Sequence, residues 1–329
     1  MAGSGKAHLR PGGDILLTVE DLTVEFKAAG KKVVKAVSGV SFDVQRGETL
    51  AVVGESGCGK STLGKALIQL PPPKSGSVVF EGRDLTLLEK DALREIRPAI
   101  QMIFQDPVSS LNPRLPISSI IDEPLSIWGR GDAAERSKKV DELLESVGLE
   151  PALVRDRKSY EFSGGQCQRI SIARSLALEP MLLICDEPVS ALDVSVQAQI
   201  LNLLADMKER YGLTLIFISH DLAVVKAIST RIMVMYLGKI CEVSAPDDLY
   251  AQPRHHYTHA LISSVLIPDP EVTRSSVTLQ GEPPSPMDPP SGCRFRTRCP
   301  AATDLCAQEE PQLREVSAGH FVACHFPRN

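Results

Sequence analysis

Apolar residues over the first 250 positions follow two alternating patterns. Short runs such as ETLAVV (48–53), MLLICDE (181–187) and TLIFISH (214–220) are apolar throughout or nearly so, as the buried strands of a parallel sheet are. In RSKKVDELLESVGL (136–149) the apolar residues instead recur every three or four positions, which is typical of an amphipathic helix. Strands that alternate with helices predict an α/β fold with a mostly parallel sheet.

Other runs refine this prediction. Residues 15–26 and 33–44 are rich in β-branched residues and partly alternate, so we expect an antiparallel β part formed from the N-terminus. A hairpin is expected around Gly238, and a helical subdomain over residues 106–180. The remaining predicted elements are short strands at 77–80 and 100–104 and helices at 60–70, 164–178 and 194–210.

The length of the chain predicts more than one domain. The chain has 329 residues, more than one core usually organises. We expect a flexible leader (1–13), a large domain (14–250) and a loop-rich appendage (251–329) with a proline-rich linker over 268–290.

Lys plus Arg number 36 against 41 for Asp plus Glu, a net charge of −5, which argues against a nucleic-acid partner. Without a long apolar run or a signal peptide, we expect a cytoplasmic chain whose membrane role comes from partners.

The strongest chemical motif is GESGCGKS at residues 54–61. It fits G-x-x-x-x-G-K-S between a predicted strand and a predicted helix, the context of a phosphate-binding loop. The glycines let backbone N–H groups converge on phosphate oxygens, and the helix N-terminus adds partial positive charge. Lys60 would reach the β- and γ-phosphates and Ser61 would bind Mg²⁺. The expected ATP-binding residues here are Gly54, Gly57, Gly59, Lys60, Ser61 and Thr62.

A second motif lies at the end of the run LLICDE. An apolar strand that ends in carboxylates places Asp186 at the carboxyl edge of the sheet, where it would hold Mg²⁺. Glu187 follows directly and is suited to polarise an attacking water. Each feature alone is weak, but together with the phosphate loop they predict an ATPase.

A third set of residues resembles a family. Phe162-Ser-Gly-Gly-Gln166 precedes the LLICDE run, and with Gln105, Asp193 and His220 it resembles the ATP-binding subunits of ABC transporters over residues 15–245. The resemblance implies that Gln105 touches Mg²⁺ or water, that Asp193 forms the D-loop and that His220 contacts the γ-phosphate. It implies that the signature binds ATP held by the opposite subunit, through Ser163, Gly164, Gly165 and Gln166.

Some positions carry less information. Phe26 is the candidate for stacking on adenine, and the alternative is an ordinary core or edge aromatic. Phe162 stands where the family at large has Leu, and Cys167 stands where a basic residue is common. The second departure puts a polar contact at the edge of the site in doubt.

The C-terminal part narrows the resemblance. QPRHHYTHAL (252–261) and the later segment GCRFRTRCPAATDLC resemble ATP-binding subunits of oligopeptide, dipeptide and nickel importers. That family implies two integral-membrane permease subunits, a second ATP-binding subunit, indirectly an extracytoplasmic substrate-binding protein, and a peripheral place on the cytoplasmic face of the membrane. Peptide import is therefore expected; the alternatives are import of nickel or another small solute, a soluble ABC ATPase of DNA repair or translation, and a metal or redox sensor.

Four of the eight cysteines fall close together near the C-terminus. Cys299 precedes a proline, as ligands of iron–sulfur clusters can, and some relatives in the resembled subfamily carry such a cluster. We therefore expect a four-iron, four-sulfide (4Fe–4S) cluster. Zinc, reduced thiols and disulfides remain alternatives, although zinc cysteines normally come in closer pairs. The expected ligands are Cys293, Cys299, Cys306 and Cys324. His255, His256 and His259 are expected to pack locally rather than to bind metal.

Overall fold

The computed structural model describes residues 5–10, 12–28, 32–264 and 281–329. The chain forms two compact units. Unit 1 combines Met1–Leu88 with Phe217–Asn329, and unit 2 is Glu89–Ile216. The division falls inside strand β8 (Thr214–Ser219). The helical subdomain predicted for residues 106–180 therefore lies within unit 2, which covers a longer stretch of the chain.

Unit 1 contains two groups of strands. One is an antiparallel sheet of order β2-β1-β4-β5, the antiparallel part expected from the N-terminus. In the other the order is β11-β12-β10-β9-β3, and β3 pairs in parallel with β9. All five residues of β3 are buried, as its apolar run predicts. The bounds are β1 (Ile15–Lys27), β2 (Val33–Gln45), β3 (Thr49–Val53), β4 (Ser75–Phe80), β5 (Arg83–Asp84), β9 (Arg231–Tyr236), β10 (Lys239–Ser244), β11 (Arg314–Ser317) and β12 (His320–Val322).

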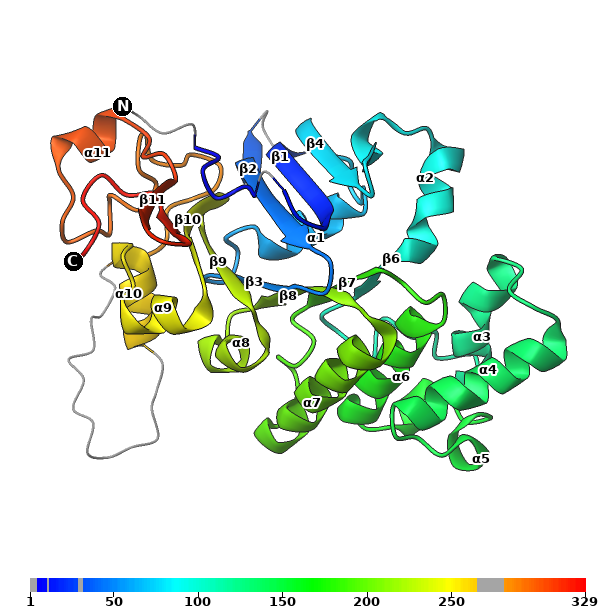
Figure 1. The fold of residues 1–329 in the computed structure, drawn as a ribbon. Helices are drawn as coiled ribbons and strands as arrows, with labels where there is room; N and C mark the ends of the chain where they lie inside the picture. The colour runs from blue at the N-terminus through cyan, green and yellow to red at the C-terminus, as the bar shows by residue number, and fades with distance from the viewer. Residues whose placement is uncertain (1–4, 11, 29–31, 265–280) are drawn as a thin grey trace. The chain divides into compact units, whose positions relative to one another are not determined.

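The described helices of unit 1 are short. The first α-helix follows the phosphate loop, as predicted, and the other α-helices of this unit lie in the second half of the chain (Figure 1). They are α1 (Lys60–Leu67), α8 (Leu222–Ile228), α9 (Pro246–Ala251), α10 (His256–Ser263), α11 (Asp304–Gln308) and the 3₁₀ turn η2 (Leu85–Leu87). No helix in the described part of the chain is long and apolar enough to cross a membrane.

Unit 2 is mainly helical and also holds two parallel strands. Strand β6 pairs with β7 in register from Ile100 opposite Leu182. Buried apolar residues of α3, α4 and α6 form its core. The elements are β6 (Ile100–Ile103), β7 (Leu182–Asp186), α2 (Lys90–Ile96), α3 (Ile117–Ile127), α4 (Ala133–Ser146), α5 (Pro151–Val154), α6 (Gly164–Leu176), α7 (Val194–Tyr211), η3 (Arg97–Ala99) and η4 (Ser159–Glu161).

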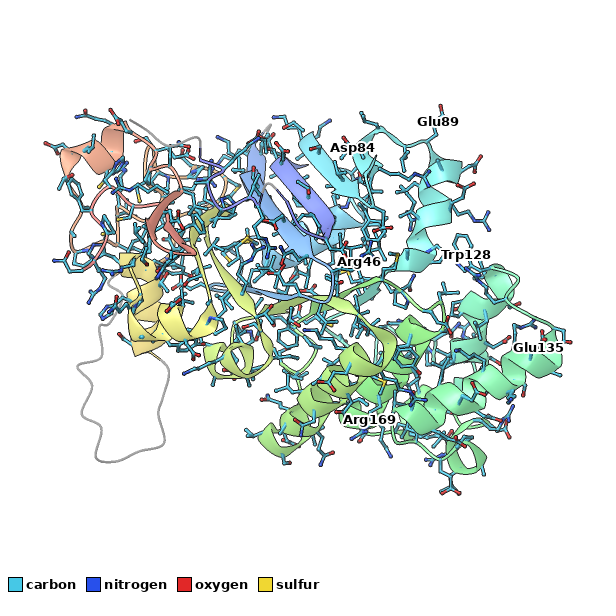
Figure 2. All side chains as sticks on the ribbon, in the orientation of Figure 1. Arg46, Asp84, Glu89, Trp128, Glu135 and Arg169 are labelled. Atoms are coloured by element: carbon cyan, nitrogen blue, oxygen red, sulfur yellow. The ribbon has the colours of Figure 1, made fainter. Side chains whose placement is uncertain are left out.

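Local sequence signals explain where the unit 2 helices begin and end. Asp132 caps α4, and Glu135, labelled in Figure 2, bonds back to the Asp132 N–H at 2.8 Å. This is a capping box, in which two otherwise unpaired N–H groups are satisfied. Helix α7 ends at Gly212, whose φ of 62° suits glycine at a helix terminus.

The described part of the predicted leader is held by unit 1. His8 is buried, and its Nε2 lies 2.5 Å from the carbonyl oxygen of Ser41. Arg10 makes ion pairs with the buried carboxylates of Asp43 and Glu48 at 2.5 and 2.6 Å. His8 and Arg10 thus contact the rest of unit 1, and the flexible leader stays a prediction.

The C-terminal appendage is attached to the β-structure of unit 1 by a buried carboxylate. Glu242 on β10 accepts hydrogen bonds from the N–H groups of Arg254 and His255 at 2.7 and 2.9 Å. Its Oε1 also lies 2.5 Å from Nε2 of His320 on β12. Glu242 thus joins three segments of the chain. Part of the proline-rich linker predicted at 268–290 lies outside the described residues.

Removing this carboxylate should loosen the appendage. We expect Glu242→Ala to lower the free energy of unfolding by roughly 3 kcal/mol, since two N–H groups and an imidazole lose their buried partner. Denaturant titration with proteolysis of the C-terminal region measures this. Glu310→Ala is the control, because Glu310 pairs with Lys239 at an exposed site, and its loss should cost less than about 1 kcal/mol. Equal effects would contradict the anchoring role.

Candidate functional site

The phosphate loop joins the end of β3 to the start of α1 in unit 1. A Cβ at Gly54 would lie 2.2 Å from the carbonyl oxygen of Met235, and one at Gly59 would lie 2.1 Å from that of Ala36. Both glycines also have positive φ, 153° and 106°, which disfavours other residues. Close packing of the loop against neighbouring backbone therefore requires glycine here.

Lys60 begins α1 and is buried. Its Nζ donates to the carbonyl oxygens of Gly54 and Glu55 at 2.8 and 3.0 Å. The ammonium thus lies against the loop, and Ser61 and Thr62 follow in the first turn of α1. A cation and a helix N-terminus at one loop form an anion-binding arrangement, as the motif predicts.

Sequence reasoning missed a contact of this loop with the appendage. The Glu55 N–H donates to Oη of Tyr257 at 2.8 Å. Its carboxylate accepts two hydrogen bonds from Arg298, at 2.7 and 3.1 Å, and this pair raises the pKa of the arginine. Glu55 occupies a position that the motif leaves open, and it lies 243 residues from Arg298. No sequence pattern connects the two.

The carboxylates at the end of β7 lie in unit 2. Asp186 is the last residue of the strand and is buried. Glu187 has a φ of 47°, a left-handed conformation that costs free energy for a non-glycine residue. The Nε2 of Gln105 donates to Oε2 of Glu187 at 3.0 Å. The structure thus brings together two predicted site residues through a contact that the sequence did not predict.

The signature segment begins helix α6. Ser163 is the N-cap, its Oγ accepts from the Gln166 N–H at 3.3 Å, and the Gln166 side chain accepts from the Ser163 N–H at 3.0 Å. The guanidinium of Arg157 lies 4.6 Å from the centre of the Phe162 ring. Cys167 is buried, and its thiol lies 3.4 Å from the carbonyl oxygen of Ser159. The cysteine is therefore part of the core of unit 2.

The remaining predicted nucleotide ligands lie at exposed positions. Asp193 precedes α7, and His220 follows β8. Phe26 is on β1 and is 40% exposed. These positions are accessible to a ligand, and the roles predicted for them, like those of Ser61, Gln105 and Asp186 toward Mg²⁺, stay predictions.

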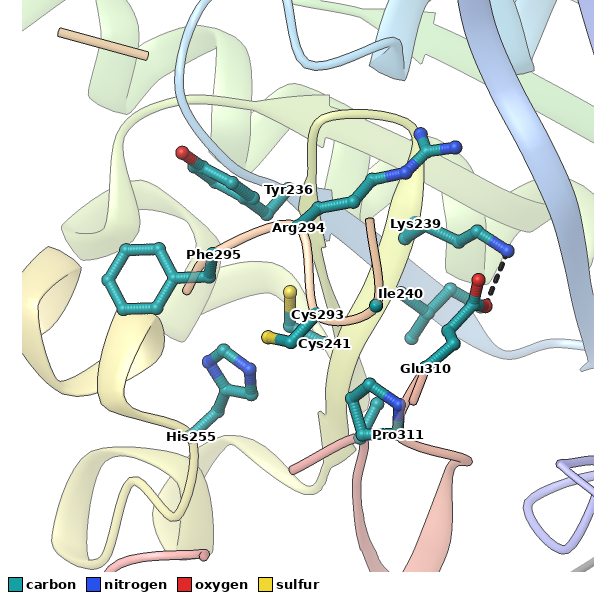
Figure 3. Close-up of a pocket in the computed structure, with 12 residues that line it drawn as sticks. Tyr236, Lys239, Ile240, Cys241, His255, Cys293, Arg294, Phe295, Glu310 and Pro311 are labelled. Carbon is teal, nitrogen blue, oxygen red and sulfur yellow. Dashed lines mark hydrogen bonds and ion pairs between the residues drawn. The ribbon is translucent and has the colours of Figure 1, made fainter. Parts of the chain in front are cut away.

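The four tail cysteines line one pocket, together with His255 and His325. Burial raises the pKa of the Cys293 and Cys299 thiols, and it raises that of Cys324 to about 12, with the other three cysteines adding to the effect. A neighbouring pocket contains the buried Cys241 beside Cys293 (Figure 3). Within the described ranges, no group of three or more His, Cys, Asp or Glu side chains is arranged to hold a metal ion. This finding supports neither the zinc alternative nor the four-iron cluster, and the cluster stays a prediction.

Comparison with known proteins adds to this geometry. The family model described as ABC transporter matches residues 37–190, and the one described as oligopeptide/dipeptide transporter, C-terminal region, matches residues 241–306. A putative oligopeptide transport ATP-binding protein of Bacillus subtilis, YkfD, is 52% identical over 95% of this chain and 96% of its own. A putative peptide import ATP-binding protein of Brucella ovis is 50% identical over 94% of this chain and 97% of its own.

A solved structure is similar as well. The ATP-binding cassette MJ0796, a dimer in a post-hydrolysis state bound to ADP and Pi, superposes with a TM-score of 0.64 at 30% identity. It covers 70% of this chain and 98% of its own. These comparisons confirm the predicted α/β cassette.

His255, which lines the cysteine pocket, makes the stability of the folded chain depend on pH. Its Nδ1 accepts from the Tyr257 N–H at 3.0 Å and caps α10, and burial lowers its pKa from 6.5 to about 4. The unfolded chain thus binds more protons between these values, so the stability from neutral His255 is complete above about pH 6.5 and is lost as pH falls toward 4. We expect His255→Asn, which keeps a capping acceptor, to flatten the fall in melting temperature between pH 7 and 5. Parallel curves for the two proteins would refute this.

Proposed function

Because this chain belongs to the ABC transporter family of ATP-binding proteins, we propose that it hydrolyses ATP to power the import of di- or oligopeptides. One observation carries the proposal: a complete cassette, with phosphate loop, carboxylate strand end and signature, continues into a peptide-transporter C-terminal region. The two relatives named for oligopeptide transport and peptide import match nearly the whole chain, appendage included.

The phosphate loop supplies the binding half of the mechanism. The N–H groups of Gly54, Gly57 and Gly59 and those that begin α1 would bind phosphate oxygens, and Lys60 would neutralise the β- and γ-phosphates. Ser61 would bind Mg²⁺ through its hydroxyl, Thr62 would complete the loop, and Phe26 would stack on adenine. The near-complete burial of Lys60 strengthens its attraction for phosphate, because little solvent screens it.

The carboxylate strand end supplies the hydrolytic half. Asp186 and Gln105 would bind Mg²⁺, Glu187 would take a proton from the attacking water, and His220 would hydrogen-bond the γ-phosphate. The hydrogen bond from Gln105 to Glu187 supports this assignment, because it orients the carboxylate that would accept a proton from the attacking water. Phosphoryl transfer needs mainly positioning and charge neutralisation, which these groups provide.

Ser163 and Gln166 of the signature are exposed, and Gly164 and Gly165 are half-buried, which supports a role toward a second ATPase subunit. Ser163, Gly164, Gly165 and Gln166 would bind the γ-phosphate of ATP held by the opposite chain, and Asp193 would lie in that interface. ATP would then close the dimer, and hydrolysis would reopen it. The closure would move two permease subunits on the cytoplasmic face of the membrane, where this chain would be a peripheral protein. An extracytoplasmic binding protein would deliver the peptide.

The four tail cysteines would hold a 4Fe–4S cluster. The four thiols line one pocket, and this placement supports the proposal, because each cysteine of such a cluster binds a different iron. When bound, the cluster would organise a segment that has little core of its own.

Substitution of Glu187 tests the function. In the transporter assembled with its permeases, we expect Glu187→Gln to keep ATP binding, slow hydrolysis by roughly 10²–10⁴-fold and stop uptake of labelled peptide. The contrast is Lys60→Ala, which should lose ATP binding itself. Hydrolysis at the parent rate in Glu187→Gln would remove the base assignment. Uptake of nickel, with none of peptide, would replace the proposed solute.

Anaerobic preparation tests the cluster. The full chain should be brown, with broad visible absorption and about four irons and four sulfides per chain. Cys306→Ser should lose most of the colour, whereas Cys167→Ser, in the core of α6, should keep it. Colourless protein with one zinc, or metal-free protein with four titratable tail thiols, would refute the proposal.

A further inference from the structure

Glu55 is fixed at every polar group it possesses. Its N–H donates to Oη of Tyr257 at 2.8 Å, its carbonyl oxygen accepts from Nζ of Lys60 at 3.0 Å, and its carboxylate accepts twice from Arg298. Hydrogen bonds on both sides of one residue fix the two adjacent peptide planes. Those planes begin the phosphate loop, whose N–H groups must point at an anion.

The appendage residues that hold Glu55 are themselves held firmly. The Arg298 side chain is 5% exposed, and its guanidinium carbon lies 5.9 Å from the centre of the Tyr236 ring. Phe295, three residues earlier, is buried with its ring centre 5.3 Å from that of Tyr236 and 5.4 Å from that of Tyr257. Arg298 and Tyr257 therefore both pack against the same aromatic cluster, and both contact Glu55 of the phosphate loop.

The charge of Glu55 gives the contact a second effect. A carboxylate in a phosphate loop repels the triphosphate, and at 25% exposure water only partly screens it. The bidentate guanidinium neutralises this charge in the geometry that binds a carboxylate most strongly. Without Arg298, a nucleotide would meet both a negative charge and a looser loop.

We propose that Arg298 and Tyr257 are positioning residues for ATP binding, through which the C-terminal appendage holds the phosphate loop of its own chain in the ATP-ready form. When the loop is already ordered before binding, the free energy of binding ATP is not reduced by the cost of ordering it. The proposal rests on the phosphate-loop assignment made above. It adds that the appendage acts on nucleotide affinity within its own subunit.

Binding of MgATP to the full chain, followed with a fluorescent ATP analogue, tests this. We expect the Kd of Arg298→Met to rise about tenfold, because one buried partner of a charge pair is lost. Arg298→Lys should recover part of the affinity, since Lys keeps the charge without the bidentate geometry. Arg296→Met is the matched control: Arg296 lies in the same segment and bonds to Ser291 instead of the loop, so its Kd should not change.

Three further readouts separate positioning from a loss of structure. Amides of the phosphate loop should exchange hydrogen faster in Arg298→Met without nucleotide, while the melting temperature stays near that of Arg298→Lys. In the assembled transporter the KM for ATP should rise and kcat at saturating ATP should stay constant. In a double-mutant cycle with Glu55→Gln, the effect of Arg298→Met should shrink, because the partner is gone.

The outcomes that overturn the proposal are distinct. Arg298→Met that binds ATP as well as Arg296→Met, or better than the parent chain, would refute it, and so would additivity with Glu55→Gln. If Lys60→Ala loses ATP binding in the same assay, such a result leaves the phosphate-loop assignment standing. If Lys60→Ala binds ATP normally, the assignment itself fails.

Discussion

The ion pair between Arg298 and Glu55 connects the C-terminal segment of the chain to the predicted phosphate loop. A guanidinium and a carboxylate removed from most solvent stabilise a structure only when both are present in good geometry. Much of unit 1 provides that geometry: the aromatic cluster of Phe295 sets the direction of Arg298, and β12 extends the strands that include β10. The buried Glu242 then holds the start of α10, from which Tyr257 reaches the same loop.

The carboxylate predicted to act in hydrolysis lies in unit 2 and is held in a different way. There the carboxylate of Glu187 follows a buried strand with a left-handed backbone, and Gln105 holds its side chain. The conformational cost of such a residue must be offset by packing around it, and the five buried residues of β7 provide that packing. The side chains of Glu55 and Glu187 are thus held by unlike means, the first by an ion pair and the second by a hydrogen bond from an amide.

The sequence predicted what depends on local pattern. The apolar runs placed β3, β7 and β8, the phosphate-loop motif placed α1, and Ser163 marked the start of α6. These signals are complete within a few residues, so they can be read from the chain directly. The pairing of Gln105 with Glu187 and that of Glu55 with Arg298 join residues 82 and 243 positions apart, and they depend on tertiary packing that periodicity does not encode. The anchoring of His8 and Arg10 was missed for the same reason, because a glycine-containing leader carries no sign of the distant carboxylates that bind it.

The distance along the chain between the phosphate loop and its supports has a consequence for synthesis. A ribosome makes Glu55 before Tyr257 and Arg298, so the nascent chain carries the predicted nucleotide motifs before it carries the two residues that contact Glu55. A chain cut short by truncation or proteolysis before Arg298 would keep its cassette but leave Glu55 without its cation. Nucleotide affinity would then report whether the polypeptide is complete, and fragments would compete poorly with finished subunits for ATP.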